Sequence, residues 1–147
     1  MNGTGSFMFT NFLSNTKGDL KVSKGTVRFR KGSGWTSVTN IVLAGGTLAV
    51  DVGAGATAFG PQQNKSDAIM TVVSTNSPTL SIAAGEQATV NMLAIVEEDG
   101  RIHEKNPGVY GGPAAGLSAN QTLSWISGSG TLFVRRSALN GTMLIVR

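Results

Sequence analysis

The sequence predicts an all-β fold, and three observations support that prediction. Charged residues make up only 14% of the 147 residues while 20 are glycine, a composition typical of a strand-rich protein with many tight turns. Apolar residues recur at every second position in several short segments, which is the period of a strand with one buried face. No segment carries apolar residues at helical spacing over the length of a capped amphipathic helix.

Residues 18–52 contain the clearest strand pattern. The apolar residues of 20–22 occupy even positions, whereas those of 26–29 occupy odd positions. One straight strand would turn half of these side chains towards water, so we expect a turn or bulge at Lys24-Gly25. The Gly45-Gly46 pair is expected to act in the same way before the next strand. The buried row of that strand is expected to comprise Leu48, Val50 and Val52.

The rest of the chain is a series of further short strands and loops. The expected strands are 5–9, 20–22, 26–29, 38–43, 47–52, 68–73, 78–82, 89–96, 123–126, 130–134 and 141–146. Residues 68–73 are continuously apolar, so we expect them to be buried on both faces. Loops are expected at 11–16, in a surface excursion formed by 53–56 and then 61–66, and at 106–113, where Gly and Pro are frequent.

A short unit recurs along the chain, in which Gly and Thr precede two hydrophobic residues that flank a third residue. It occurs at 25–29, 46–50, 130–134 and 141–145, with a copy headed by proline at 78–82. The spacing is irregular, so no fixed-period repeat is present. A β-solenoid accommodates loops of different length between its coils, and an antiparallel β-sandwich or jelly roll accommodates them equally. The residues alone leave both architectures open.

Two parts of the sequence resemble a known kind of protein. The stretch GDLKVSKGTVRFRKGSGW with the later VLAGGTLAV is similar to the strand repeats of bacterial autotransporter-like, right-handed parallel β-helix proteins. LSIAAGEQATVNMLAIVEEDGRI, followed by PGVYGG and WISGSGTLFV, resembles the segment that closes such arrays in large secreted bacterial proteins. The resemblance implies a right-handed parallel β-helix over residues 1–147, a single β-rich domain that is a fragment or terminal module of a longer secreted chain. It also implies an extracellular or cell-surface location and transfers no catalytic residue.

Basic residues are concentrated in one part of the chain. The net charge is +4, and six of the twelve Lys and Arg residues lie between Lys17 and Lys31, with Asp19 as the one acid there. The predicted binding residues are Lys21, Arg28, Arg30, Lys31 and Trp35. The first three lie opposite the apolar rows, so stacked faces would align them in a positive outer stripe, and Trp35 offers a ring for a sugar to stack on.

This basic stripe predicts contact with an acidic polysaccharide. The alternative is a solvated face that keeps the protein soluble and blunts edge pairing. Nucleic acid is a less suitable partner, because no helix-turn-helix, zinc finger or aromatic strand motif accompanies the charge. The sequence therefore predicts a non-catalytic structural or adhesive module.

Residues with catalytic chemistry are few. The chain has one histidine and no cysteine, and Glu97 to Asp99 lack the spaced ligands of a calcium loop, so we expect no metal site and no cofactor. Arg101, His103, Lys105 and Tyr110 have the side-chain types of a polysaccharide lyase, but one Pro-Gly-rich loop carries all four and would hold them poorly. A carbohydrate-active enzyme, or its ancillary carbohydrate-binding domain, is the alternative function; we expect no enzyme.

Two further expectations concern membranes and self-association. No window contains the eighteen or more apolar residues of a membrane-spanning helix, so membrane insertion is not expected. Residues Met143 to Val146 are expected to form an apolar strand at an open end of the fold, where another copy could pair.

Overall fold

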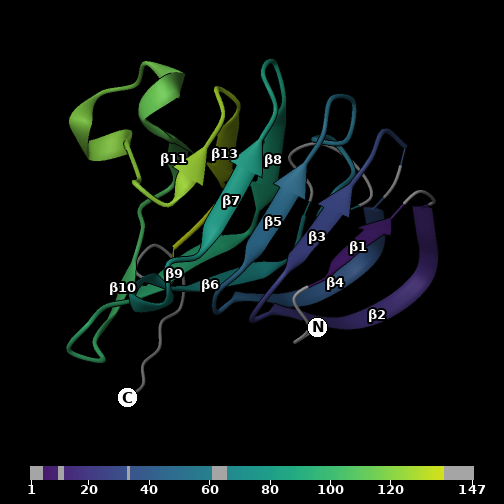
Figure 1. Cartoon of the computed structure of the whole chain (residues 1–147), viewed down its shortest axis with the longest axis horizontal. Coiled ribbons are helices and arrows are strands. Elements are labelled where there is room, and N and C mark those ends of the chain that lie inside the picture. The colour runs from purple at the N-terminus through teal and green to yellow at the C-terminus, as the bar shows by residue number, and fades with distance from the viewer. Residues whose placement is uncertain (1–4, 10–11, 33, 61–65, 138–147) are drawn as a thin grey trace.

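A computed structural model describes residues 5–9, 12–32, 34–60 and 66–137, with the backbone alone described for 6–9, 12–17 and 34–37. The described part of the chain is all-β and adds only three short 3-10 turns (Figure 1). The strands are β1 (Ser6–Phe9), β2 (Phe12–Val22), β3 (Thr26–Phe29), β4 (Gly34–Leu43), β5 (Thr47–Val50), β6 (Ile69–Val73), β7 (Thr79–Ile82), β8 (Gln87–Val90), β9 (Met92–Val96), β10 (Ile102–Glu104), β11 (Gly108–Gly111), β12 (Ile126–Ser127) and β13 (Thr131–Val134). The turns are η1 (Ser74–Asn76), η2 (Pro113–Ala115) and η3 (Ala119–Gln121). None of the described helical segments has the length and apolar character needed to cross a membrane.

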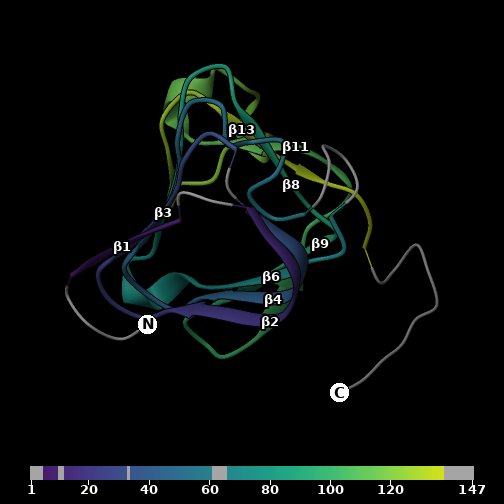
Figure 2. The same cartoon turned by 90° about the vertical axis from the view of Figure 1, so that its right-hand side faces the viewer.

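The strands form three mostly parallel sheets. Sheet A has the order β1-β3-β5-β7-β12 and is parallel throughout. Sheet B has the order β10-β9-β6-β4-β2, and sheet C the order β11-β13-β8; only β10 and β11 pair in the antiparallel sense. Seen along the stacking direction, the three sheets lie around a common interior (Figure 2). This pairing differs from the antiparallel sandwich that the sequence had left open.

The turns at Lys24-Gly25 and Gly45-Gly46 are confirmed, and they explain the recurring Gly-Thr unit. At each turn the chain passes from sheet B to sheet A. The amide N–H of Thr47 donates to the Gly25 carbonyl oxygen at 2.8 Å, and that of Thr79 donates to the Gly46 carbonyl oxygen at 2.9 Å. Gly46 has φ +66°, and a Cβ there would lie 2.6 Å from the Gly25 oxygen. The corner at Gly46 therefore requires glycine.

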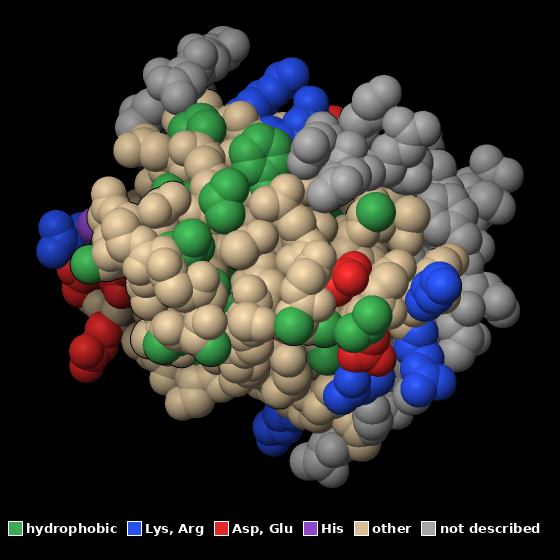
Figure 3. All heavy atoms as spheres, turned by 90° about the horizontal axis from the view of Figure 1, so that it is seen from above, with side chains coloured by type: hydrophobic (Ala, Val, Ile, Leu, Met, Phe, Trp, Pro, Cys, Tyr) green, Lys and Arg blue, Asp and Glu red, His purple; other side chains and the backbone are tan. Residues whose placement is uncertain are grey.

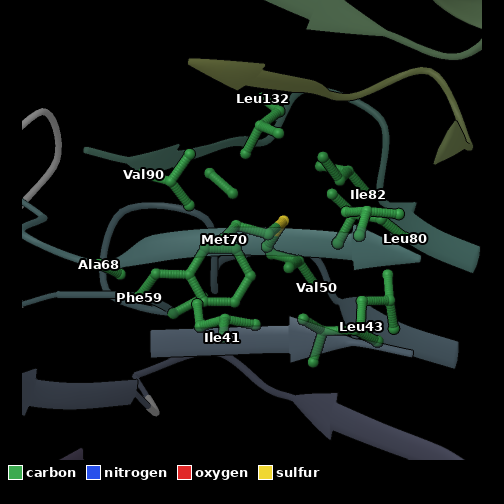
Figure 4. Packing of buried hydrophobic residues seen from close by; sticks show 14 of the residues in the cluster. Ile41, Leu43, Val50, Phe59, Ala68, Met70, Leu80, Ile82, Val90 and Leu132 are labelled. Carbon is green, nitrogen blue, oxygen red and sulfur yellow. The ribbon is translucent and has the colours of Figure 1, made fainter. Parts of the chain in front are cut away.

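The core consists of apolar side chains that repeat in register from strand to strand (Figure 4). One row of sheet A contains Val27, Leu48, Leu80 and Ile126, and one row of sheet B contains Leu20, Ile41, Met70 and Leu93. Sheet C contributes pairs such as Ala88 with Leu132. Because each row continues through several strands, burial in one strand depends on the next.

The predicted strand 89–96 is two strands. β8 ends at Val90 in sheet C and β9 starts at Met92 in sheet B. The buried apolar residues are even-numbered in β8 (Ala88 and Val90) and odd-numbered in β9 (Leu93 and Ile95), so the chain must turn between them at Asn91. This is the same change of parity that predicted the turn at Lys24-Gly25.

Two expectations about burial are wrong. Val52 is 69% exposed, because β5 ends at Val50 and the chain turns away from sheet A. The excursion after it is not wholly on the surface in its described part: Ala54 and Ser66 are buried, and between them Phe59 is buried with its ring edge-on to Phe29 at 5.7 Å. Residues 61–65 lie outside the described part.

The remaining differences concern strand boundaries and faces. β6 alternates between buried and half-buried residues, so 68–73 is not buried on both faces. The expected loops at 11–16 and 106–113 contain strands. In the first, β2 starts at Phe12 and pairs with β4, with shifts in the pairing register along the way. In the second, β11 pairs with β13. Of the strand expected at 123–126, only Ile126 lies in a strand. Together with the next residue, Ser127, it forms β12, which pairs with β7. The strand expected at 141–146 lies outside the described residues.

Candidate functional site

The carboxylate of Asp51 lies between two of the predicted arginines. Arg28 is central in β3 and its Nη1 lies 2.5 Å from Asp51 Oδ1, while Arg30 follows β3 and its Nε lies 3.9 Å from Asp51 Oδ2. The Arg28 and Asp51 side chains are 39% and 26% exposed, so this pair stabilises the fold by at most about 1 kcal/mol. Its main effect is to fix the Arg28 guanidinium in position.

These residues line an open hollow of about 640 Å³ on the outer side of sheet A. The lining residues are Arg28, Arg30, Lys31, Asp51, Val52 and Ala83. Three cations face one carboxylate, which leaves the hollow with a formal charge of +2. Lys31 is exposed, and its aliphatic stem lies so close to Gly53 that a Cβ there would be 2.7 Å from Lys31 Cγ. The exposed Val52 gives this cationic hollow an apolar side.

The other predicted site residues lie elsewhere. Lys21 is exposed on β2 in sheet B and lines a separate hollow with Lys24 at the corner where the chain passes to sheet A. Lys21 and Arg28 therefore do not share the face of one sheet, and the basic residues form two groups. The backbone of Trp35 pairs with that of Leu13 at the start of β4, and its side chain lies outside the described part of the structure.

Sequence reasoning missed Asp51, although the repeat carries a signal for it. Aligning the Gly-Thr units 25–29 and 46–50 places Arg30 and Asp51 at the same position, one residue past the strand. The pairing of Phe29 with Val50 confirms that alignment. A parallel stack brings equivalent positions of successive strands side by side, so the alignment predicts the contact.

Charged side chains gather towards opposite ends of the molecule (Figure 3). Lys and Arg side chains, with acidic side chains beside them, lie at the end that carries β1 and β3, and the single histidine lies with both acidic and basic side chains at the other. Among these, Asp99 accepts a 2.9 Å hydrogen bond from the amide N–H of Arg101 and contacts its guanidinium. The backbone bond, then the side-chain bond, holds the pKa of Asp99 below its ordinary value.

The four residues with lyase-type side chains are divided. Arg101 and His103 are exposed on the hairpin that β9 and β10 form. Lys105 and Tyr110 line a different hollow, where the Lys105 ammonium lies 5.9 Å from the centroid of the Tyr110 ring. Tyr110 is 7% exposed and its hydroxyl donates to the Asn106 carbonyl oxygen at 2.8 Å. Burial raises the pKa of Tyr110 above its ordinary value.

The described residues contain no group of three or more His, Cys, Asp and Glu side chains that could hold a metal ion. No family model matches the chain, and comparison with curated proteins and with solved structures finds no significant match.

Proposed function

We propose that the chain is a short right-handed parallel β-helix that acts as a non-catalytic structural or adhesive module of a secreted or surface bacterial protein. We further propose that it contacts anionic glycans through the hollow lined by Arg28, Arg30 and Lys31. One observation carries the binding proposal: three cationic side chains from β3 and its end line one open hollow that contains a single carboxylate.

The parallel registers support the β-helix. In Figure 2 the viewer looks from the end that carries β1 and β2. The chain passes from sheet B to sheet A and, in its later part, on to sheet C in the clockwise sense while it recedes, which is the sense of a right-handed coil. The continuous core rows and the glycine corners are what a stacked solenoid needs. The location at a bacterial surface rests on the sequence resemblance.

The chemistry of the hollow favours a carboxylated or sulfated polymer. Arginine presents a planar fork of donors that matches a carboxylate or sulfate, and Asp51 already occupies part of that fork on Arg28. A glycan carboxylate would therefore compete with Asp51 or bind the remaining donors. Val52 gives the apolar face of a sugar ring a surface to pack on. The hollow is open rather than enclosed, so a polymer can cross it.

A glycan array at low and at moderate salt tests this proposal, with three variants beside the wild type. Arg28→Ala with Arg30→Ala should abolish most binding to acidic glycans, and Asp51→Asn should strengthen it because a competing carboxylate is removed. The matched control is Lys21→Ala with Lys24→Ala, which removes the same charge from the corner hollow. Equal weakening by both double variants would show that overall charge rather than the hollow binds. Weaker binding by Asp51→Asn would contradict competition by this carboxylate and show that Asp51 positions the arginines for the ligand.

We also propose that the chain self-associates through an open strand edge. Among the described strands, β2 is the longest and pairs on one side alone, with β4. A long unpaired edge is a template for another strand. Sedimentation velocity over a range of concentrations should show a dimer or larger species; a monomer at every concentration would count against self-association.

A further inference from the structure

A second hollow, of about 530 Å³, lies at the end of the molecule that carries β10 and β11 (Figure 1). One wall is the chain from Glu104 to Tyr110, and the other is the segment from Ser118 to Gln121, which includes η3. None of the residues of the cationic hollow lines it. It therefore needs its own chemical explanation.

We propose that this hollow binds an uncharged, hydroxyl-rich ligand, namely a neutral oligosaccharide. The lining is rich in side chains that both donate and accept hydrogen bonds: Asn106, Asn120 and Gln121 supply amides and Ser118 a hydroxyl. Each amide has a carbonyl oxygen that accepts and an NH₂ group that donates. Ser118 Oγ lies 2.6 Å from both Asn120 Oδ1 and Gln121 Oε1, and Gln121 Nε2 donates to the Val109 carbonyl oxygen. A sugar would therefore bind chiefly through the Asn106 amide and the Asn120 NH₂ group. The proposal does not depend on the anionic-glycan site.

The charge balance of the hollow selects against an anion. Glu104 and Lys105 are the two charged residues of the lining, and their formal charges cancel. The cationic hollow, by contrast, carries +2. A uronate or sulfate would meet Glu104 here without an excess of cations, whereas a neutral sugar can use the carboxylate as an acceptor and the ammonium as a donor.

The two walls are fixed relative to one another before any ligand binds. Gln121 Nε2 donates to the Val109 carbonyl oxygen at 3.1 Å and ties the two walls directly. The Tyr110 hydroxyl donates a hydrogen bond to the Asn106 carbonyl oxygen at 2.8 Å, and the Leu123 amide donates to the Gly111 carbonyl oxygen at 2.8 Å. A preformed site loses little conformational entropy on binding, which matters for a ligand held by a few exposed hydrogen bonds.

The hollow also offers a small apolar surface. Pro107 is exposed and Val109 is half-buried, and both belong to the wall that faces η3. A pyranose ring has one face of C–H groups, which can pack against this wall while its hydroxyls reach the amides opposite. Asn106 and Asn120 are exposed, and Ser118 holds the Asn120 amide oxygen at 2.6 Å, so the Asn106 amide and the Asn120 NH₂ group can exchange water for ligand without rearrangement.

NMR titration of the uniformly ¹⁵N-labelled full chain tests the proposal. The probes are short neutral gluco-, manno-, galacto- and xylo-oligosaccharides, with an oligouronate as the charged comparison. At least one neutral oligosaccharide should shift the side-chain amide signals of Asn106, Asn120 and Gln121. These shifts should persist at about 1 M salt, where the Debye length is only about 3 Å. The oligouronate should instead shift the signals of Arg28 and Arg30, and high salt should suppress these shifts.

Paired variants locate the site. Asn106→Ala with Asn120→Ala should weaken neutral-sugar binding about tenfold, because two hydrogen-bonding amides are lost. Gln121 is left unchanged because it fixes the walls. The control, Thr39→Ala with Thr75→Ala, removes two exposed hydroxyls away from the hollow and should bind like the wild type.

Three results would overturn the proposal: no neutral oligosaccharide shifts these signals, the shifts fall outside the hollow, or the double asparagine variant binds like the wild type. A backbone amide spectrum of each variant that matches the wild type outside the substituted sites confirms that a loss of binding is not a loss of folding. Loss of acidic-glycan binding in the Arg28→Ala and Arg30→Ala variant, with neutral-sugar binding retained, would support two independent sites.

Discussion

Substitution of Gly46 by alanine tests whether successive corners of the chain are stacked. Gly46 has φ +66°, which costs an L-residue about 1–2 kcal/mol. An alanine Cβ would also lie 2.6 Å from the Gly25 carbonyl oxygen and 2.9 Å from the Lys24 carbonyl carbon, closer than side-chain atoms approach backbone. The neighbouring corner must therefore move, and overpacking of this kind costs about 1–3 kcal/mol more.

Gly85 provides the matched control. It has φ +79° in a turn, and a Cβ there would meet nothing within 4 Å. Gly85→Ala should therefore cost only the conformational part, about 1–2 kcal/mol, whereas Gly46→Ala should cost about 2–5 kcal/mol. The difference between the two isolates the contact between stacked corners.

Urea unfolding followed by tryptophan fluorescence measures both free energies of unfolding. Trp125 packs against the core, so its emission should change when the core opens. The two variants should shift the midpoint by different amounts at a similar m-value. Equal losses of stability at Gly46 and Gly85 would refute the stacked-corner explanation, because strain at positive φ would then account for the whole effect.

Three further predictions concern the core, the buried tyrosine and the exposed hairpin. Leu80 is fully buried between in-register residues of β5 and β12, so Leu80→Ala should cost about 2–5 kcal/mol in the same urea assay. Val52→Ala, at an exposed site, should change stability by less than about 0.5 kcal/mol. Because burial raises the pKa of Tyr110, the stability that the protonated phenol contributes is fully present below the pKa of a tyrosine in the unfolded chain. This contribution is lost as the pH rises through the pKa of Tyr110 in the folded protein, and Tyr110→Phe should flatten the loss. Because the pKa of Asp99 is lowered in the folded protein, the ionised carboxylate stabilises the β9–β10 hairpin at neutral pH. This stabilisation is lost as the pH falls through the pKa of Asp99 in the folded protein. Asp99→Asn should therefore speed amide hydrogen exchange in the hairpin at neutral pH only.

The parity of apolar residues predicted the corners of this fold where it was applied. The switch from even to odd positions across Lys24-Gly25 correctly placed a turn, and the same switch between Val90 and Leu93 marks the corner from sheet C to sheet B. That second corner was missed because no glycine or proline punctuates it; Asn91 stands there instead. Parity adds to turn composition rather than replacing it, because the buried residues Met70, Val72, Leu80 and Ile82 are all even-numbered across the corner from β6 to β7.

The core residues that lie outside the strands could not be predicted from the local pattern of apolar residues. Ala54, Ala58 and Phe59 follow a strand in a Gly-Ala-rich stretch without strand or helix periodicity, which is the composition of a loop. All three belong to the core cluster, and Phe59 meets Phe29 of the much earlier β3 edge-on. Only the three-dimensional arrangement reveals that contact.

The cationic hollow follows from the repeat more directly than from the count of basic residues. Phe29, Val50 and Ile82 end successive strands of sheet A in register, so the residues that follow them, Arg30, Asp51 and Ala83, form a column along the stack. All three line the hollow, and the backbone continues the ladder there: the Asp51 amide donates to Phe29 and the Ala83 amide to Val50, each at 3.0 Å. Lys21 is basic but belongs to a column of sheet B, which explains why it lies apart. In a stack of this kind, positions just past equivalent strand ends are brought together whatever the loop lengths between them. A ligand that crosses this hollow should therefore run along the stacking direction and meet one residue from the end of each strand.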